Sequence, residues 1–343
     1  MKALVLKKKD ELVVMDMPLQ GTMGPDSVRI AVKNVGICGS DVHYYTHGRI
    51  GPFIVDAPMI LGHEAAGIVV EVGANVKGLA PGDRVCMEPG IPNPKSRASK
   101  IGLYNLDPDV QFWATPPVHG CLIEEVIHPA EFTFKLPDNV SLAEGAMVEP
   151  LAIGLQAAKK AAITPGDVAV VIGAGTIGIM CAISALAGGC SRVFVVDMKA
   201  EKLDIAASYP GITAINVAQQ NAVSTVLEAT GGWGADIAIE ASGAPPVFAS
   251  ITDYCCPGGK IVLVGIPIDP IPMDVARIQS KELTITSVFR YANIYPRAIE
   301  LIASSQLNVK KLITDIYPFA KVIEAYERAK ELRPGDVKIQ IEL

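Results

Sequence analysis

The sequence predicts a two-domain α/β protein, with a β-rich domain of irregular, largely antiparallel strands and a second domain built on a doubly wound parallel sheet. Two observations predict this fold class. Up to about residue 135, short apolar runs alternate with Gly and Pro, a pattern typical of antiparallel β structure. After about residue 165, six short, continuously apolar runs are separated by helix-compatible sequence, as in a parallel sheet buried on both faces.

The candidate elements follow in chain order. In the β-rich region the strands are expected in VRIAVKNV, AAGIVVEV, GDRVCM and CLIEEVI. Ser141 is followed three residues later by Glu144, the pattern of a capping box that begins a helix, and Pro150 could kink that helix. The six parallel strands are expected in VAVVIG, SRVFVVD, AINV, ADIAIE, KIVLVG and LTITSV. The C-terminal region returns to helix–helix–strand, and the alternation in DVKIQIEL predicts a half-exposed strand.

Composition and charge limit the possible functions. The chain has 343 residues, of which 50% are hydrophobic and 19% charged, as in a globular protein of about two domains. The N-terminus has no uninterrupted apolar run, so we expect neither a signal peptide nor a membrane partner, and a cytoplasmic location. A net charge of −6, without a Lys/Arg block beyond Lys7 to Lys9, argues against nucleic acid and favours a small-molecule partner.

The cysteines do not form a recognisable framework. There are seven, with no C-x-x-C pair, at positions 38, 86, 121, 181, 190, 255 and 256. An odd number without paired spacing argues against disulfides and against a zinc knuckle. Most are therefore expected to be buried small apolar side chains.

A dinucleotide fingerprint opens the second region. Residues 173–178 read GAGTIG, directly after an apolar strand and at the start of a helix. Gly173 allows a tight turn, Gly175 lets the backbone approach a pyrophosphate, and Gly178 permits close helix–strand packing. A Gly-rich turn in an unrelated α/β domain is the alternative interpretation.

The end of the next strand supports the dinucleotide interpretation. Asp197 stands about twenty residues after the glycines, where a carboxylate accepts hydrogen bonds from an adenosine ribose. A carboxylate there would repel a 2′-phosphate, so NAD is favoured over NADP, with Lys202 as a nearby opposing charge.

Two segments of the first region carry potential metal ligands, CGSDVHYY at 38–45 and GHEAAG at 62–67. Cys38, His63 and Glu64 offer the mixed sulfur, nitrogen and oxygen set that suits zinc with one position left open. Glu149 lies inside an apolar helix, where an acid is costly unless paired or near a cation. Each residue also has an ordinary interpretation, as a core thiol, a turn histidine or a surface acid, and spacing alone does not assemble them into one site.

The order C-G-S-D-x-H, G-H-E-x-x-G, E-P-L and G-A-G-x-I-G resembles the zinc-dependent medium-chain dehydrogenases over nearly the whole chain. The polyol (sorbitol/xylitol) dehydrogenase branch is indicated by four segments: EPG at 88–90, GLYNL at 102–106, FWATPP at 112–117 and VFRYANIYPRAI at 288–299. The resemblance implies a GroES-like catalytic domain of residues 1–150 and 290–343, a Rossmann NAD-binding domain of residues 151–289, and a homotetramer.

The resemblance also implies roles for residues at the metal. Cys38, His63 and Glu64 would be zinc ligands, and Glu149 would either bind the metal or hold a water beside it. In this family the metal acts as a Lewis acid on the alcohol oxygen while a hydride leaves the carbinol carbon for the nicotinamide. Ser40 and His43 would pass the alcohol proton to solvent.

Further contacts follow from the same resemblance. The polyol is expected to meet Tyr44, Phe112, Thr115, Glu149, Arg290 and Tyr291. Beyond the fingerprint glycines and Asp197, the cofactor is expected to meet Ile177, Lys202, Val264, Gly265, Ile266, Val288, Phe289 and Arg290. Lys202 stands where relatives commonly have Arg, which removes a fork-shaped donor.

The segment 88–110 departs from the family pattern. Many members hold a second, structural zinc there with four cysteines spaced C-x2-C-x2-C-x7-C, which align here with Asn93, Ser96, Ser99 and Asp107. Because these side chains lack the thiolates that hold such a zinc, the sequence predicts one catalytic zinc per chain. The order of this lobe would then come from its prolines, from local side-chain hydrogen bonds, and from Arg97 and Lys100 pairing with acids.

The sequence therefore predicts an NAD-dependent zinc enzyme that reversibly oxidises a secondary hydroxyl of a polyol, such as sorbitol or xylitol, to the ketose. Dehydrogenases of 2,3-butanediol, L-threonine or other secondary alcohols share the zinc motifs, and Arg290 with Tyr291 favours polyols over them. A catalytically inactive binding or structural protein on the same scaffold is a remote alternative, which the presence of Cys38, His63 and Glu64 disfavours.

Overall fold

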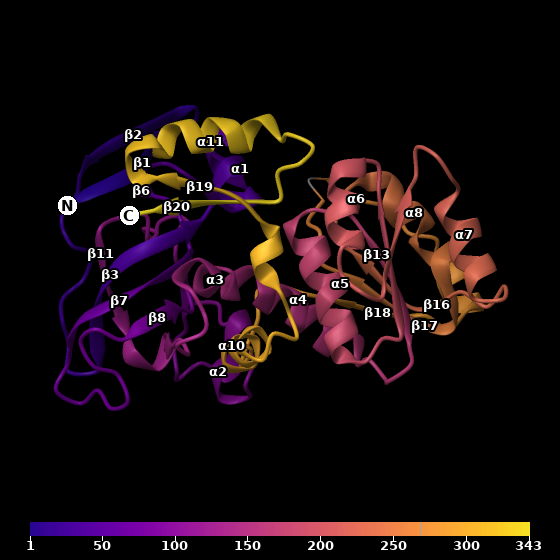
Figure 1. Cartoon of the computed structure of the whole chain (residues 1–343), viewed down its shortest axis with the longest axis horizontal. Coiled ribbons are helices and arrows are strands. Elements are labelled where there is room, and N and C mark those ends of the chain that lie inside the picture. Colours follow the sequence, from indigo (N-terminus) through magenta and orange to yellow (C-terminus); the bar gives the residue numbers. More distant parts are fainter. Residues whose placement is uncertain (268) are drawn as a thin grey trace. The chain divides into compact units, whose positions relative to one another are not determined.

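The computed structural model describes residues 1–267 and 269–343, which form two compact units (Figure 1). Unit 1 comprises Met1–Glu149 and Tyr295–Leu343, and unit 2 comprises Pro150–Ile294. Both chain ends, indigo and yellow in Figure 1, thus belong to unit 1. The second boundary falls later than the expected residue 290, because residues 290–294 belong to unit 2.

Unit 1 is built on a mostly antiparallel seven-stranded sheet. In sheet order its strands are β12 (Thr133–Lys135), β8 (Arg84–Met87), β7 (Glu64–Val72), β3 (Ser27–Gly36), β20 (Lys338–Glu342) and β19 (Ile313–Pro318), with β11 (Glu125–Pro129) also on β3. Only β19 and β20 run parallel. A second sheet has the order β2 (Glu11–Asp16), β1 (Lys2–Lys8) and β6 (Met59–Ile60). The expected antiparallel β-rich domain is confirmed.

Shorter elements complete unit 1. Two strand pairs are β4 (Arg49–Ile50) with β5 (Phe53–Ile54) and β9 (Gly90–Ile91) with β10 (Gln111–Phe112). The helices are α1 (Gly39–His47), α2 (Arg97–Lys100), α3 (Leu142–Ala146), α10 (Tyr295–Ala303) and α11 (Val322–Glu331). Single 3₁₀ turns are η1 (Tyr104–Leu106), η2 (Ala130–Phe132), η3 (Val309–Leu312) and η4 (Phe319–Lys321).

The helix expected after Ser141 begins with the predicted capping box. Ser141 Oγ accepts a hydrogen bond from Glu144 N, and Glu144 Oε2 accepts one from Ser141 N. The helix is broken, however, before the proline that was expected to kink it. α3 ends at Ala146 and α4 (Val148–Ala161) follows, with Pro150 in its first turn, where a missing N–H is tolerated.

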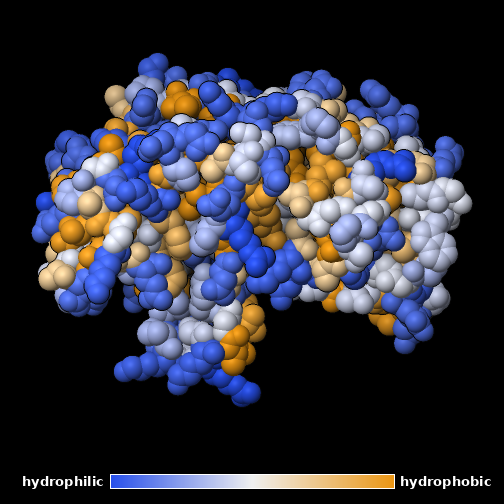
Figure 2. Space-filling model, turned by 60° about the horizontal axis from the view of Figure 1, so that its bottom comes forward, coloured by the Kyte–Doolittle hydropathy of each residue, from blue (hydrophilic) through white to orange (hydrophobic). Residues whose placement is uncertain are grey.

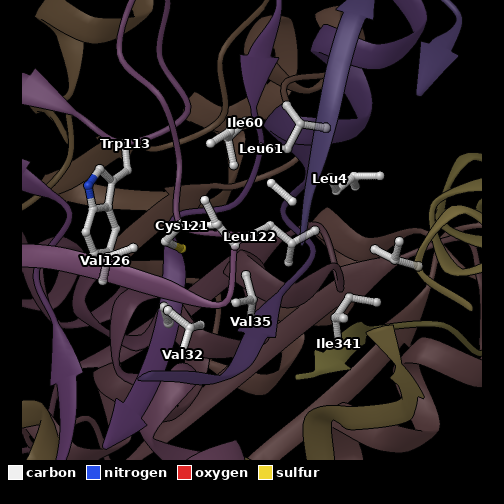
Figure 3. Close-up of a cluster of buried hydrophobic side chains, with 14 of the residues drawn as sticks. Leu4, Val32, Val35, Ile60, Leu61, Trp113, Cys121, Leu122, Val126 and Ile341 are labelled. Atoms are coloured by element: carbon white, nitrogen blue, oxygen red, sulfur yellow. The ribbon is translucent and has the colours of Figure 1, made fainter. Parts of the chain in front are cut away.

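The core of unit 1 is apolar and is contributed by distant parts of the sequence (Figure 3). Leu4 comes from β1, Val35 from β3 and Ile341 from β20, and all three are fully buried. Leu61 and Leu122 join them, and the backbone N–H of Leu122 donates to the carbonyl of Leu61. This packing fixes the segment that leads into residue 63.

The C-terminal strand β20 differs from the expectation of a half-exposed strand. Its first four residues are buried, including the polar Lys338 and Gln340. The strand lies between β3 and β19, and α11 packs against it. The alternating pattern predicted that one face of this strand would be exposed to solvent. In the structure, the polar side chains on that face are instead buried against other groups of the protein.

Unit 2 is a six-stranded, fully parallel sheet. Its order is β15 (Ile212–Asn216), β14 (Arg192–Asp197), β13 (Val168–Ile172), β16 (Ala235–Glu240), β17 (Cys255–Leu263) and β18 (Thr284–Ser287). The helices between strands are α5 (Thr176–Gly188), α6 (Ala200–Ala207), α7 (Ala222–Ala229), α8 (Pro245–Tyr254) and α9 (Val275–Ser280). This is the doubly wound order whose direction reverses between β13 and β16, and the prediction of six such strands is confirmed.

Hydrophilic residues predominate on the face in Figure 2, with apolar residues scattered between them. Among the described residues, no helix is both long enough and apolar enough to cross a membrane.

Candidate metal and cofactor sites

Three of the predicted metal ligands meet in unit 1. Cys38 is the N-cap of α1, His63 directly precedes β7, and Glu64 is the first residue of β7. A ligand atom from each lies within 4.8 Å of the other two, and no other group of three such residues is found in the described part of the chain. His63 and Glu64 are buried and Cys38 is half-buried. The fold therefore brings together three candidate metal ligands whose spacing in the sequence did not predict a common site.

Asp41 ties the two segments of this cluster together. Its Oδ2 accepts a hydrogen bond from Cys38 N (3.2 Å) and its Oδ1 one from Gly62 N (3.3 Å). Oδ1 also lies 3.6 Å from His63 Nδ1, which is longer than a hydrogen bond but close enough for strong attraction. Burial lowers the pKa of His63, and the negative charges of Asp41 and Cys38 outweigh it and raise that pKa well above its ordinary value. Asp41 belongs to the C-G-S-D-x-H motif but was not predicted as a site residue.

Glu64 has a cation beside it. The buried ammonium of Lys338 lies 2.7 Å from Glu64 Oε1 and 2.6 Å from Oε2, and it donates to the carbonyl of Ile37 at 3.0 Å. Burial lowers the pKa of Lys338, but the carboxylate of Glu64 and the charge of Cys38 raise it above its usual value. Lys338 was not predicted as a site residue, since its strand was expected to face solvent.

The residues predicted to carry the proton lie on α1. Ser40 is half-buried near the start of the helix, and the His43 ring stacks on the exposed His47 ring, with centroids 4.2 Å apart and planes at 14°. Burial, and then the charge of His47, lower the pKa of His43. His43 is therefore held as a neutral base near neutral pH.

In unit 2 the three fingerprint glycines have the geometry that their roles require. Gly173 has a φ of +109°, and Gly178 packs so closely that a Cβ there would lie 1.8 Å from the carbonyl oxygen of Gly173. A Cβ on Gly175, the N-cap of α5, would meet no atom within 4 Å. The turn is thus tight at its first and third glycine and open at the second, where a phosphate approaches in dinucleotide-binding folds.

A pocket of about 490 Å³ lies at this turn and includes Gly173, Gly175, Asp197 and Lys202 in its lining. Asp197 Oδ2 accepts a hydrogen bond from Ala174 N at 2.7 Å, and Oδ1 accepts from the backbone N–H groups of the two residues that follow Asp197. The carboxylate is thus fixed at the rim of the pocket.

Family models match a segment in each half of the chain. Residues 24–138 match the alcohol dehydrogenase GroES-like domain and residues 176–304 match the zinc-binding dehydrogenase domain. A putative D-xylulose reductase of Rhizobium meliloti is 59% identical over 342 residues, covering 100% of this chain and 99% of the relative. The chain belongs to the zinc-dependent medium-chain dehydrogenases.

Two further proteins are similar over most of the chain. Rat sorbitol dehydrogenase is 42% identical over 311 residues, covering 90% of this chain and 87% of the relative. A crystal structure of an Escherichia coli oxidoreductase/dehydrogenase of unknown specificity superimposes with a TM-score of 0.95 at 36% identity, covering 99% of this chain and 98% of the other. The predicted family and its polyol branch are confirmed.

The remaining predicted residues of this medium-chain dehydrogenase are spread over both units. In unit 1, Tyr44 is buried on α1, the Phe112 ring lies 5.7 Å from the His63 ring, and Thr115 N donates to the carbonyl of Phe112. Arg290 and the buried Tyr291 belong to unit 2. Their contacts with a polyol stay predictions.

Glu149 is buried in the first turn of α4, and its charge raises the pKa of both Lys338 and Glu88. Its carboxylate is not part of the described group of three ligand atoms within 4.8 Å. Direct binding of the metal by Glu149 therefore stays a prediction.

The other predicted cofactor residues lie outside the lining of the pocket. Ile177 is in α5, and Val288, which directly follows β18, donates its backbone N–H to the carbonyl of Leu263 at the end of β17. Ile266 and Phe289 are exposed, and the Arg290 guanidinium lies 4.9 Å from the Phe289 ring. The backbone N–H groups of Val264 and Gly265 both donate to the carbonyl of Glu240.

Glu88 is a buried acid that was expected only as part of the EPG segment. Tyr104 Oη donates to its Oε1 at 2.7 Å. Burial raises the pKa of Glu88 to about 7; Tyr104 opposes the shift, and the charge of Glu149 adds to it. His128 Nε2 lies 3.0 Å from the Glu88 carbonyl, and burial lowers the pKa of His128 to about 4, so this histidine stays neutral.

The lobe at residues 88–110 is held by hydrogen bonds at the four positions aligned with cysteines. The buried Asp107 accepts from Asn93 N through Oδ2, and Ser96 Oγ lies 3.0 Å from Ser99 Oγ while accepting from Ser99 N at 3.1 Å. The expected local side-chain hydrogen bonds are present. The expected ion pairs are not: in residues 1–267 and 269–343, neither Arg97 nor Lys100 lies within 4.0 Å of an acidic oxygen.

Proposed function

We propose that this chain reversibly oxidises a secondary hydroxyl of a polyol to the ketose, with NAD bound to unit 2 and one zinc ion bound by Cys38, His63 and Glu64 in unit 1. The observation that supports this most directly is the thiol, imidazole and carboxylate within 4.8 Å of one another. A soft, a borderline and a hard donor around one point form the set used by catalytic zinc, which keeps a position open.

The surroundings of the cluster also fit zinc. His63 Nδ1 is buried, has no hydrogen-bond partner among the described residues and lies next to Asp41. A histidine ligand usually turns one ring nitrogen to a carboxylate and the other to the metal. When bound here, zinc would supply the Lewis acidity that eases loss of the hydroxyl proton.

The protein's own groups would handle that proton. Ser40 and His43 are assigned to carry it, because a hydroxyl can accept and donate at once and a neutral imidazole can accept. The lowered pKa of His43 keeps it in the accepting form near neutral pH. The stacked and exposed His47 offers contact with solvent beside it.

NAD is assigned as the hydride acceptor because Asp197 stands at the rim of the unit 2 pocket. Oδ2 of this fixed carboxylate accepts one backbone hydrogen bond and has a lone pair left to accept from a ribose hydroxyl, whereas Oδ1 already accepts two. The same charge would disfavour a 2′-phosphate.

The names of the relatives guide the choice of substrate. The relative named as a D-xylulose reductase is more similar to this chain than the rat sorbitol dehydrogenase, at 59% against 42% identity. Xylitol and D-xylulose are therefore the first pair to test. Polyol contacts are assigned to Tyr44, Phe112, Thr115, Glu149, Arg290 and Tyr291.

The proposal includes three further points: a single zinc per chain, a homotetramer and a cytoplasmic location. The hydrogen-bonded lobe supports the first, because Asp107 accepts from the backbone N–H of Asn93, the Ser96 and Ser99 hydroxyls contact each other, and none of the four residues offers a thiolate. The tetramer rests on the resemblance to the family, and light scattering coupled to gel filtration would test it.

The decisive experiment measures NADH formation with xylitol, sorbitol, ribitol, 2,3-butanediol and L-threonine, alongside zinc per chain. Activity confined to butanediol or threonine would exclude the polyol function. Cys38→Ala should lose both zinc and activity. Cys190→Ala removes a buried thiol of unit 2 and is the matched control, which should keep both.

A further inference from the structure

Glu240 is a buried carboxylate of unit 2 that no part of the proposed function uses. It is the last residue of β16, next to the point where the strand order reverses, and it is 0% exposed. Its Oε1 accepts three hydrogen bonds, from Ser242 N at 2.8 Å, Ser242 Oγ at 2.5 Å and Gly243 N at 2.9 Å. One oxygen thus fixes the turn that follows the strand.

The same residue also holds the end of the neighbouring strand β17. The carbonyl of Glu240 accepts from Val264 N at 2.8 Å and from Gly265 N at 3.0 Å. A Cβ on Gly265 would lie 2.4 Å from Glu240 Oε2 and 2.3 Å from Gly243 N. The two turns are therefore packed backbone to backbone around one carboxylate, and Gly265 is required for that packing.

This arrangement forms part of the wall of the dinucleotide pocket. Ser242 and Ala244 line the pocket together with Gly173 and Gly175. A Cβ on Gly173 would lie 3.1 Å from Ser242 N and from the carbonyl of Ala241. A shift of the turn at Ser242 would therefore press directly on the first turn of the fingerprint.

A buried carboxylate is an energetically costly hydrogen-bond acceptor if its role is purely structural. Within residues 1–267 and 269–343, Glu240 forms no ion pair, and its buried Oε2 has no hydrogen-bond partner. A buried acid without a cation beside it is unfavourable, so stability alone does not favour this residue here. The position beside the pocket gives a reason for keeping the residue, since a functional site commonly retains groups that stability alone would not favour.

We propose that Glu240 is a positioning residue for the dinucleotide. Its carboxylate sets the turn at Ser242 and Gly243, and that turn shapes the pocket in which the adenosine side of NAD is held. The inference rests on the proposed function in taking NAD as the ligand of unit 2. It adds a residue that acts on cofactor affinity without touching the polyol or the metal.

The test compares NADH affinity, by fluorescence titration, with the Michaelis constants for NAD and xylitol. Glu240→Ala should weaken NADH binding by about tenfold or more and raise the Michaelis constant for NAD, with that for xylitol nearly unchanged. Glu240→Gln keeps one oxygen acceptor and should restore affinity to within about threefold of the wild type. If the alanine variant does not fold, Glu240→Asp replaces it in the titration. This variant withdraws the carboxylate by one methylene, and we expect the same weakening of NADH binding.

Val226→Ala is the control for a merely structural effect, because Val226 is fully buried in the core of unit 2 and absent from the pocket lining. It should lower the melting temperature without changing NADH affinity. An alanine or aspartate variant that binds NADH as the wild type does would overturn the proposal, as would a glutamine variant as weak as alanine. Failure of the proposed function would give a different result: the wild-type protein would bind NADH but oxidise no polyol.

Discussion

The ammonium of Lys338 lies within 2.7 Å of both carboxylate oxygens of Glu64, and both side chains are almost completely buried. The acid of the proposed zinc cluster is therefore charge-paired by the protein itself. Such a pair repays its desolvation only with further hydrogen bonds, and the contact with the Ile37 carbonyl supplies one. The pair fixes the carboxylate beside Cys38 and His63, and zinc must compete with the ammonium for it.

Lys338→Met should destabilise the metal-free protein strongly. Removing one member of a buried pair leaves an uncompensated charge and costs roughly 3–5 kcal/mol in unfolding free energy. Added zinc should recover part of the loss, because the metal then compensates Glu64. Urea unfolding with and without zinc measures both effects.

The matched control for that variant is Lys330→Met. Lys330 is exposed, forms long surface ion pairs with Asp10 and Glu327, and lies 5.1 Å from the Tyr45 ring, so its loss should cost only about 1 kcal/mol. Equal unfolding curves for the two variants would show that the Lys338 pair contributes nothing.

The buried contact of Lys338 could not be predicted from the sequence. The fingerprint glycines, Asp197 and the six strands of unit 2 were predictable because each rests on a local pattern. The partner of Lys338 lies 274 positions away, and the alternation of DVKIQIEL is the same whether its polar residues meet water or a buried acid. Asp41 and Glu88 were missed for the same reason, since their importance depends on contacts that only the fold creates.

Asp107→Ala should destabilise the lobe without changing the zinc content. Asp107 is buried and accepts hydrogen bonds from the backbone N–H groups of Asn93 and Asp109. Leaving these donors without their acceptor should cost about 1–3 kcal/mol. Asp109→Ala, which removes only an exposed contact to Asn93 Nδ2, should cost much less. Elemental analysis should give one zinc per chain in all three proteins, and a ratio near two in the wild type would contradict the proposal for the lobe.

The pH dependence of polyol oxidation should depend on His47. Burial and the charge of His47 lower the pKa of His43, so the neutral, proton-accepting form persists below pH 6.5 and activity is lost only as the pH falls through that lowered pKa. His47→Gln removes the charge that disfavours protonation, so the acid limb of kcat/KM should move to higher pH. Thr46→Val removes the hydroxyl that contacts His47 Nδ1 at 2.7 Å without removing a charge, and its profile should match the wild type. An acid limb that stays in place in the His47 variant would exclude this coupling.

We expect Asp197 to be the main determinant of the preference for NAD over NADP. Two cations, Lys199 and Lys202, line the same pocket, so removing the carboxylate leaves a site with the charge that a 2′-phosphate requires. Asp197→Ser should therefore lower kcat/KM for NAD and raise it for NADP, shifting their ratio by about a hundredfold, or two steps of 1.4 kcal/mol.

Adding Lys202→Gln to that variant should remove part of the gain with NADP, because one of the two cations is lost. Lysine supplies a point charge where a fork-shaped arginine would bind phosphate more tightly, so NADP affinity in the single variant should rise further with Lys202→Arg. If NADP use in Asp197→Ser does not respond to either change at Lys202, the 2′-phosphate is bound elsewhere and specificity is set by the shape of the pocket rather than by its charges.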